Sequence, residues 1–219
     1  MLWRVVKSIR LIAGGNASLL AAMLWYRAWW RLRGLNFGTA THAELGLDPA
    51  RASFHKDGGG PQLRRALERL GVEEGEVVLD LGAGKGGAMA TMARFPFARI
   101  DGVELKAELV EVARANFERL GLRQCRVFEG DAAELAELDD YDVLFMFHAF
   151  STDVLERVLA NLVASLERRP RRVRIVYENP LEEPVILATG QFHRVLDYHP
   201  YEEFRICTYE TSSQVTALS

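Results

Sequence analysis

The chain has 219 residues, of which 49% are hydrophobic and 26% are charged, and its net charge is −3. This length and composition fit one globular domain with some additional chain, and the sequence holds no low-complexity tract. Residues 1–33 carry six basic residues and no acidic one, so the rest of the chain is acidic, which argues against a general nucleic-acid binder.

Two cysteines, Cys125 and Cys207, lie singly in apolar, strand-like stretches. Neither has the CxxC or Cys/His spacing of a metal site. We therefore predict two reduced thiols in the core of a cytoplasmic protein, and no metal ion.

The first candidate element follows an uncharged stretch at residues 11–26. This stretch is shorter than the roughly 20 residues that cross a bilayer, and two glycines and Asn16 interrupt it. It continues into arginines and tryptophans and shows no small-residue cleavage site, which argues against secretion. Asn16 or Ser18 can cap a helix over about 18–33.

The predicted helix over 18–33 mixes aromatic residues with arginines: Trp25, Tyr26, Trp29, Trp30, Arg27, Arg31 and Arg33. Such a composition is typical of an amphipathic helix that lies on anionic lipid at the inner face of a membrane. A helix that packs on the domain itself or against a partner has the same composition. Contact with lipid and packing on the domain or a partner therefore both stay open, and a membrane span is a third interpretation.

The stretch from 34 to about 60 is loop-like and ends in three glycines before Pro61, a typical start of a helix. We place a boundary here. Residues 1–59 form an N-terminal helix and connecting loop, and residues 60–219 form the main domain.

From the helix at 61–70 onward, strand-like and helical stretches alternate, which favours a parallel sheet covered by helices on both faces. The predicted strands are 76–81, 98–105, 123–129, 141–148 and 172–178, and the helices between them are 86–94, 106–120 and 151–168. Two last strands, 192–199 and 203–210, are close enough to pair as an antiparallel hairpin.

The sequence VVLDLGAGKGG at 77–87 places Asp80 before a loop with four glycines in six residues. The loop fits GxGxxG, follows the first strand and opens the next helix, where an open α/β sheet binds its ligand. A carboxylate at this point repels a pyrophosphate and favours a positively charged group, such as an ammonium or a sulfonium.

Two further acids follow the next two strands. Glu104 ends the second strand, where a carboxylate can accept both hydroxyls of a ribose, and Asp131 follows the third, where it can accept an adenine amino group. Each acid alone is also compatible with a solvated turn or a helix cap. Three acids after three successive strands favour a cationic, nucleoside-bearing ligand.

The stretches VLDLGAGKGG, GVEL, GDAAEL and YDVLFMFHAF resemble, in this order, the cofactor motifs of class I S-adenosylmethionine-dependent methyltransferases, over roughly residues 60–210. The resemblance implies an α/β fold with a doubly wound, mostly parallel seven-strand sheet of the Rossmann-like kind and a terminal antiparallel hairpin. It implies the cofactor S-adenosyl-L-methionine, the product S-adenosyl-L-homocysteine and no metal.

Carried over residue by residue, the resemblance implies that Asp80 and the glycine-loop backbone hold the methionine portion. Glu104 would hold the ribose, Asp131 with Ala132 the adenine, and Leu105 would pack on the adenine ring. The complete expected cofactor set is Asp80, Gly82, Ala83, Gly84, Glu104, Leu105, Asp131, Ala132 and Phe147.

The acceptor side departs from the family pattern. Amino-group methyltransferases often carry an Asn or Asp, prolines and an aromatic after the fourth strand, whereas this chain has His148, Ala149 and Phe150, which disfavours base methylation. We predict a catalytic role for His148 and Phe150, with His148 as a base or, alternatively, as a histidine that shapes the pocket.

Four further residues are candidates for the acceptor site. Phe54 and His55 lie in the loop that precedes the main domain, and Glu178 and Asn179 end the fifth strand. Phe54 and His55 either line the site or belong to an ordinary surface loop. Glu178 or Asn179 either faces the acceptor or does not.

We predict methyl transfer to an O or N nucleophile of a small molecule or a protein, with small molecules favoured and no nucleic acid expected. The alternative is a membrane-associated protein lysine methyltransferase, because the apolar N-terminus, GxGxG and GxEL resemble that group. Their aromatic-Pro-hydroxyl motif is absent, since Phe54, His55, Lys56 and Asp57 stand there. An NAD-type oxidoreductase and a non-catalytic cofactor-binding scaffold are further alternatives.

Overall fold

The structure is a computed structural model that describes residues 17–38, 58–147, 150–201 and 204–212. Across these residues, one seven-stranded sheet has the order β3-β2-β1-β4-β5-β7-β6. Its strands are β1 Val77–Leu81, β2 Arg99–Glu104, β3 Cys125–Glu129, β4 Val143–Phe147, β5 Arg174–Glu178, β6 Phe192–Tyr201 and β7 Phe204–Thr211.

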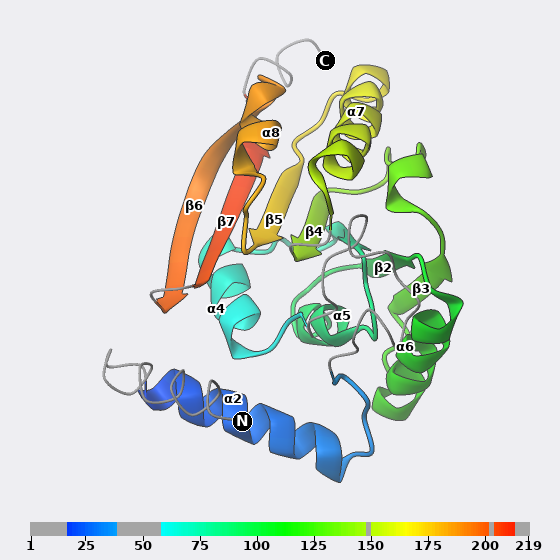
Figure 1. Cartoon of the computed structure of the whole chain (residues 1–219), viewed down its shortest axis with the longest axis vertical. Coiled ribbons are helices and arrows are strands. Elements are labelled where there is room, and N and C mark those ends of the chain that lie inside the picture. Colours follow the sequence, from blue (N-terminus) through cyan, green and yellow to red (C-terminus); the bar gives the residue numbers. More distant parts are fainter. Residues whose placement is uncertain (1–16, 39–57, 148–149, 202–203, 213–219) are drawn as a thin grey trace.

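The first five strands are parallel, and β7 is inserted between β5 and β6 antiparallel to both. The predicted mostly parallel sheet with a terminal antiparallel hairpin is therefore confirmed (Figure 1). The carboxyl ends of β1, β2 and β3 meet at one edge of the sheet, which brings the three predicted acids to the same edge.

Helices cover both faces of the sheet, as predicted. The described helices are α2 Ala17–Leu32, α4 Pro61–Leu70, α5 Gly87–Met92, α6 Ala107–Leu120, α7 Thr152–Arg168, α8 Glu183–Ala188 and the short 3-10 turn η1 Ala132–Glu134. One core cluster joins the sheet to α4, α5 and α6, and a second joins it to α7, α8 and η1. Neither α8 nor η1 was predicted.

Both core clusters draw on the same strands, which explains their near-continuous apolar sequences. In β1, Val78 belongs to the first cluster, whereas Leu79 and Leu81 belong to the second. Because side chains alternate along a strand, Asp80 shares the face of Val78, beneath α4 and α5. Cys125 and Cys207 are free and buried, so the prediction of two core thiols is confirmed.

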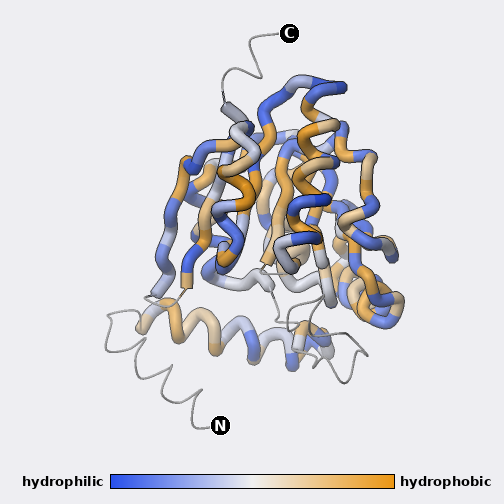
Figure 2. The backbone as a smooth tube through the Cα atoms, turned by 45° about the horizontal axis from the view of Figure 1, so that its top comes forward, coloured by the Kyte–Doolittle hydropathy of each residue, from blue (hydrophilic) through white to orange (hydrophobic). Residues whose placement is uncertain are grey.

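Helix α2 packs on the outside of α4 and α5 (Figures 1 and 2). The Tyr26 hydroxyl lies 3.0 Å from Thr91 Oγ1 of α5. Trp30 is buried and meets the rings of Tyr26 and Phe37 edge to face, with centroids 4.6 and 5.1 Å apart. Most of the aromatic residues of α2 thus anchor it to the domain, and Trp25, 70% exposed, faces outward.

A buried ion pair joins the start of β5 to the chain before β1. Arg174 is 1% exposed and pairs through Nη2 with the Glu76 carboxylate. Its Nη1 donates to the carbonyl of Gly71 at 3.2 Å, just past the end of α4. This one guanidinium therefore fixes α4 against the centre of the sheet.

We expect Arg174→Met to lower the free energy of unfolding by roughly 3–5 kcal/mol, because the Glu76 carboxylate loses its buried partner. The matched control is Arg172→Met, since Arg172 pairs with Glu73 and Glu210 but its side chain is 46% exposed. That change should cost about 0–1 kcal/mol. Denaturant unfolding of both variants checks this, and equal losses would contradict the role of Arg174.

Candidate functional site

The glycine loop between β1 and α5 is tied to the end of β2 by its own backbone. The N–H groups of Gly82 and Ala83 donate to the Val103 carbonyl at 2.9 and 3.0 Å. The N–H of Gly84 donates to Glu104 Oε2 at 2.8 Å. Gly82 and Gly84 have φ angles of 81° and 54°, which favour glycine, so the sequence of the loop follows from its shape.

Glu104 is buried at the end of β2, with 9% of its surface exposed. Besides the bond from Gly84, its Oε1 accepts the Lys106 N–H at 3.1 Å. Burial raises the pKa of Glu104, and these backbone donors oppose the rise. Each carboxylate oxygen has two acceptor positions, so Glu104 can still accept hydroxyl groups from a ligand.

Asp80, at 2% exposure, is the buried acid beneath the glycine loop. Within the described residues its Oδ2 has no hydrogen-bond partner. Burial raises the pKa of Asp80 well above its ordinary value, and the nearby Glu104 charge adds to this. A buried carboxylate without a partner is costly, and a positively charged ligand group would remove that cost.

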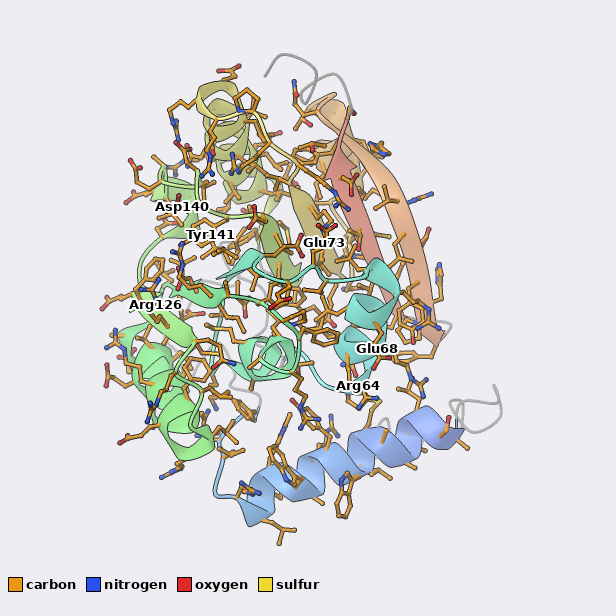
Figure 3. All side chains as sticks on the ribbon, turned by 180° about the vertical axis from the view of Figure 1, so that it is seen from behind. Arg64, Glu68, Glu73, Arg126, Asp140 and Tyr141 are labelled. Carbon is orange, nitrogen blue, oxygen red and sulfur yellow. The ribbon has the colours of Figure 1, made fainter. Side chains whose placement is uncertain are left out.

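Asp101 on the neighbouring strand β2 provides the contrast. It is also buried, at 4% exposure, but Arg99, Arg126 and Tyr141 all bind it. The Tyr141 hydroxyl donates at 3.0 Å and Arg126 donates to both carboxylate oxygens at 3.0 and 3.3 Å. Figure 3 labels these two donors, Arg126 and Tyr141. Of these two buried aspartates, Asp80 is the one with an oxygen that no described residue satisfies.

The third acid, Asp131, acts as a helix cap. Its Oδ1 accepts the Ala133 N–H at 2.9 Å at the start of η1, and Ala132 is buried behind it. Next to Glu104, Leu105 is 51% exposed although it is apolar. An exposed leucine beside Glu104 offers an apolar surface that can pack on an aromatic ring.

Phe147 and Glu178 lie together at the carboxyl ends of β4 and β5, because they are paired in the register of these two strands. Phe147 is half-buried, with its ring 6.0 Å from that of Phe204, and Glu178 is fully buried. Asn179 follows with a φ of 54° and donates its N–H to the Arg205 carbonyl at 2.8 Å.

Phe150 packs against the second core cluster, beside α7 and α8. The predicted base His148 and the loop residues Phe54 and His55 lie outside the described residues. Their roles therefore stay predictions.

The glycines at 58–60, which follow the loop with Phe54 and His55, contact the site. The sequence did not predict these contacts. Gly58 approaches Phe147, since a Cβ added to Gly58 would lie 3.6 Å from the Phe147 ring. At Gly59 such a Cβ would come within 2.6 Å of the Gly87 carbonyl oxygen, so only glycine fits there. Thr91 Oγ1 then accepts the Gly60 N–H at 2.9 Å. The three consecutive glycines were the sequence signal that could have predicted this close approach.

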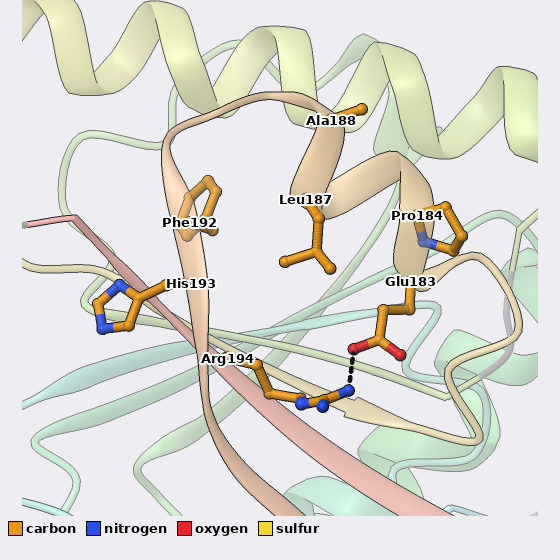
Figure 4. A pocket seen from close by; sticks show the side chains of 7 residues that line it. All are labelled: Glu183, Pro184, Leu187, Ala188, Phe192, His193 and Arg194. Atoms are coloured by element: carbon orange, nitrogen blue, oxygen red, sulfur yellow. Dashed lines mark hydrogen bonds and ion pairs between the residues drawn. The ribbon is translucent and has the colours of Figure 1, made fainter.

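A separate open hollow of about 680 Å³ lies between α8 and β6 (Figure 4). It is lined by Glu183, Pro184, Leu187, Ala188, Phe192, His193 and Arg194. Its charged groups pair with one another, since Arg194 Nη1 lies 2.7 Å from Glu183 Oε1. None of the predicted site residues lines it.

Among the described residues, no cluster of three or more His, Cys, Asp or Glu side chains is arranged to hold a metal ion. The described site consists of two buried acids, the glycine-loop backbone and the apolar residues beside them.

Comparisons with known proteins found that this chain is similar to methyltransferases. Residues 78–169 match a family model described as a methyltransferase domain. The chain is 28% identical over 119 residues to a probable cobalt-precorrin-6B C(15)-methyltransferase (decarboxylating) of Methanosarcina acetivorans, covering 51% of this chain and 64% of that protein. It is 39% identical over 97 residues to a protein-L-isoaspartate O-methyltransferase of Methylorubrum populi, covering 43% of this chain and 45% of that protein.

The chain thus spans less than two thirds of the length of either curated relative. Among solved structures, it is similar to magnesium protoporphyrin IX methyltransferase from Synechocystis with bound S-adenosylhomocysteine. The TM-score is 0.54 at 18% identity, over 68% of this chain and 80% of that one. At such an identity the likeness concerns the fold, which agrees with the strand order described above.

We expect Asp80→Asn to stabilise the free chain at neutral pH. Because the folded state raises the pKa of Asp80, wild-type stability falls as pH rises from the ordinary value of 3.8 toward the raised one. Asparagine stays neutral throughout, so the advantage of the variant should grow across that window and vanish in acid. Denaturant unfolding at about pH 4 and about pH 7 measures this. A variant that is no more stable than wild type at neutral pH would contradict it.

Proposed function

We propose that this chain, whose residues 78–169 match a methyltransferase domain and whose sheet has the order described above, is a class I methyltransferase. It would bind S-adenosyl-L-methionine and transfer the methyl group to an O or N nucleophile. The observation that carries this proposal is the Asp80 carboxylate oxygen that has no partner among the described residues, beneath a glycine loop that Glu104 holds in place. Asp80, Gly82, Ala83 and Gly84 would hold the methionine portion of this cofactor.

The other described residues of the site fit the nucleoside part of the same cofactor. Glu104 keeps acceptor positions for the ribose hydroxyls, and the exposed Leu105 fits one face of the adenine ring. Asp131 and Ala132 would bind the adenine edge, and Phe147 would close the site toward the acceptor. A dinucleotide fits less well, because two buried carboxylates beside the loop repel a pyrophosphate.

When bound, S-adenosyl-L-methionine supplies a methyl group on a positively charged sulfur. The protein then has to position the acceptor in line, exclude water and remove a proton where the acceptor carries one. Phe147 at the end of β4 and Phe204 at the start of β7 form an apolar wall, and Glu178 places a buried carboxyl group beside it. We propose His148 as the base, Phe150 as its aromatic neighbour, and Phe54, His55, Glu178 and Asn179 as the acceptor side.

For the acceptor we propose a small molecule first and a protein side chain second. The relatives include one named for a cobalt-precorrin and one named for a protein residue, so both classes occur among similar proteins. The chain outside residues 1–33 is acidic, which makes a nucleic-acid acceptor less favoured than a small molecule or a protein. A cytoplasmic location is part of the same proposal.

We expect Glu104→Gln to weaken binding of S-adenosyl-L-homocysteine roughly 10- to 100-fold, because hydrogen bonds to a charged acceptor are lost. The amide nitrogen of glutamine would also face a backbone donor. Isothermal titration measures the affinity. The matched control is Glu111→Gln on α6, where the side chain is 70% exposed, and this variant should bind as wild type does.

Wild type that binds NADH and not S-adenosyl-L-homocysteine would overturn the proposed function in favour of an oxidoreductase. Equal binding by wild type and Glu104→Gln would remove Glu104 from the site. Unchanged thermal unfolding of both variants, measured alongside, separates a lost contact from a lost fold.

Methyl transfer itself is tested with labelled S-adenosyl-L-methionine in a cell lysate, separated into protein and small-molecule fractions. We expect label in the small-molecule fraction, and a His148→Ala variant should lower the rate roughly 10²- to 10⁴-fold if His148 is the base. Label in protein supports the protein acceptor. Cofactor binding without transfer in either fraction would favour the scaffold.

A further inference from the structure

Helix α2 is apolar on two opposite faces. One face is anchored to the domain through Leu19 and Trp30, which are 0% and 9% exposed, and through Tyr26. A surface helix that serves only to pack on a domain needs one apolar stripe and presents polar residues to solvent. The second apolar face therefore needs its own explanation.

The outward face forms a continuous stripe. At 3.6 residues per turn its members fall within an arc of about 100°, opposite Trp30. They are Ala17, Ala21, Leu24, Trp25, Ala28 and Leu32, and all are exposed. Leu24, Trp25 and Leu32 are 57%, 70% and 83% exposed, whereas the exposed large apolar residues elsewhere in the described chain lie singly on separate elements. We call this stripe the outer face of α2.

Positive charge borders the outer face. Arg27 and Arg31 lie side by side along one edge of the stripe, next to Leu24, and both are exposed. Neither α2 nor any other part of residues 1–33 contains an acidic residue, while Arg4, Lys7, Arg10 and Arg33 add further positive charge. An apolar stripe with a basic margin is complementary to a surface with a negative headgroup layer above an apolar interior.

The helix is fixed to the domain, so its outer face has a defined direction. Tyr26 bonds to Thr91 at one point. Beyond the helix, Asn36 Oδ1 accepts from Lys85 Nζ at 3.2 Å, and the Asn116 amide donates to the carbonyls of Asn36 and Lys85 at 3.1 and 3.0 Å. The chain after α2 is thereby held against the outside of the glycine loop.

We propose that the outer face of α2 docks the protein peripherally on an anionic phospholipid bilayer, with Leu24, Trp25 and Leu32 in the interfacial region and Arg27 and Arg31 at the headgroups. The stripe runs along the axis of α2, so a helix that uses it lies in the plane of the membrane. No helix in the described part of the chain has the length and apolarity to cross a bilayer. A second copy of the chain fits less well, because two such helices bring only positive charge to their contact.

Flotation of the full chain with lipid vesicles tests this. We expect binding to phosphatidylcholine vesicles that contain about one third phosphatidylglycerol and little binding to phosphatidylcholine alone. A Leu24→Glu/Trp25→Glu double variant should bind the anionic vesicles at least about tenfold more weakly, since two apolar anchors are lost. Arg27→Gln/Arg31→Gln should lose roughly fivefold per arginine and most of its sensitivity to salt.

Val195→Glu is the matched control, because Val195 is 45% exposed on β6, and it should float as wild type does. All variants should keep wild-type thermal unfolding and affinity for S-adenosyl-L-homocysteine, so loss of flotation and loss of the proposed function are read separately. Wild type that does not float, that floats equally with neutral vesicles, or that floats unchanged after the double substitution would overturn the proposal. A dimer that the double variant dissociates, without flotation, would assign the face to a second copy.

Discussion

The hydrogen bond from the Gly84 N–H to the Glu104 carboxylate is the contact on which the site depends. It links the loop after β1 to the end of β2, and the bonds from Gly82 and Ala83 to Val103 reinforce it. Because these donors help to keep Glu104 charged in a buried position, one carboxylate both shapes the loop and remains an acceptor. The loop is thus held in place by hydrogen bonds to the protein's own β2 residues.

The same arrangement contains an energetically unfavourable feature, a buried carboxylate close to a second one. Asp80 lies under this loop next to a second acid, and one of its oxygens has no partner in the described part of the chain. Asp101, one strand away, shows how the fold satisfies a buried aspartate. Conflicts of this kind concentrate at functional sites, because the ligand supplies what the protein leaves out. A cationic ligand with a ribose offers a positive charge to Asp80 and hydroxyl groups to Glu104. The two acids together therefore favour one class of cofactor.

The sequence predicted the sheet well, because its strands are buried on both faces and therefore read as apolar stretches. The positions of the glycine loop, Glu104 and Asp131 at one edge of the sheet were predictable too, since each follows one of three successive parallel strands. It did not predict α8, since six residues containing a proline carry too little periodicity. For α2 the composition left lipid and packing open, and only the fold separated the inward Trp30 from the outward Trp25. The approach of Gly58 to Phe147 is a tertiary contact without a local pattern. The roles of His148, Phe54 and His55 stay predictions.

A crystal structure with bound S-adenosyl-L-homocysteine tests the central claim most directly. The account predicts the ribose hydroxyls within hydrogen-bond distance of Glu104, the amino-acid portion between Asp80 and the glycine-loop backbone, and the adenine ring against Leu105. A ligand elsewhere on the chain, or one whose ribose is bound without Glu104, would contradict it.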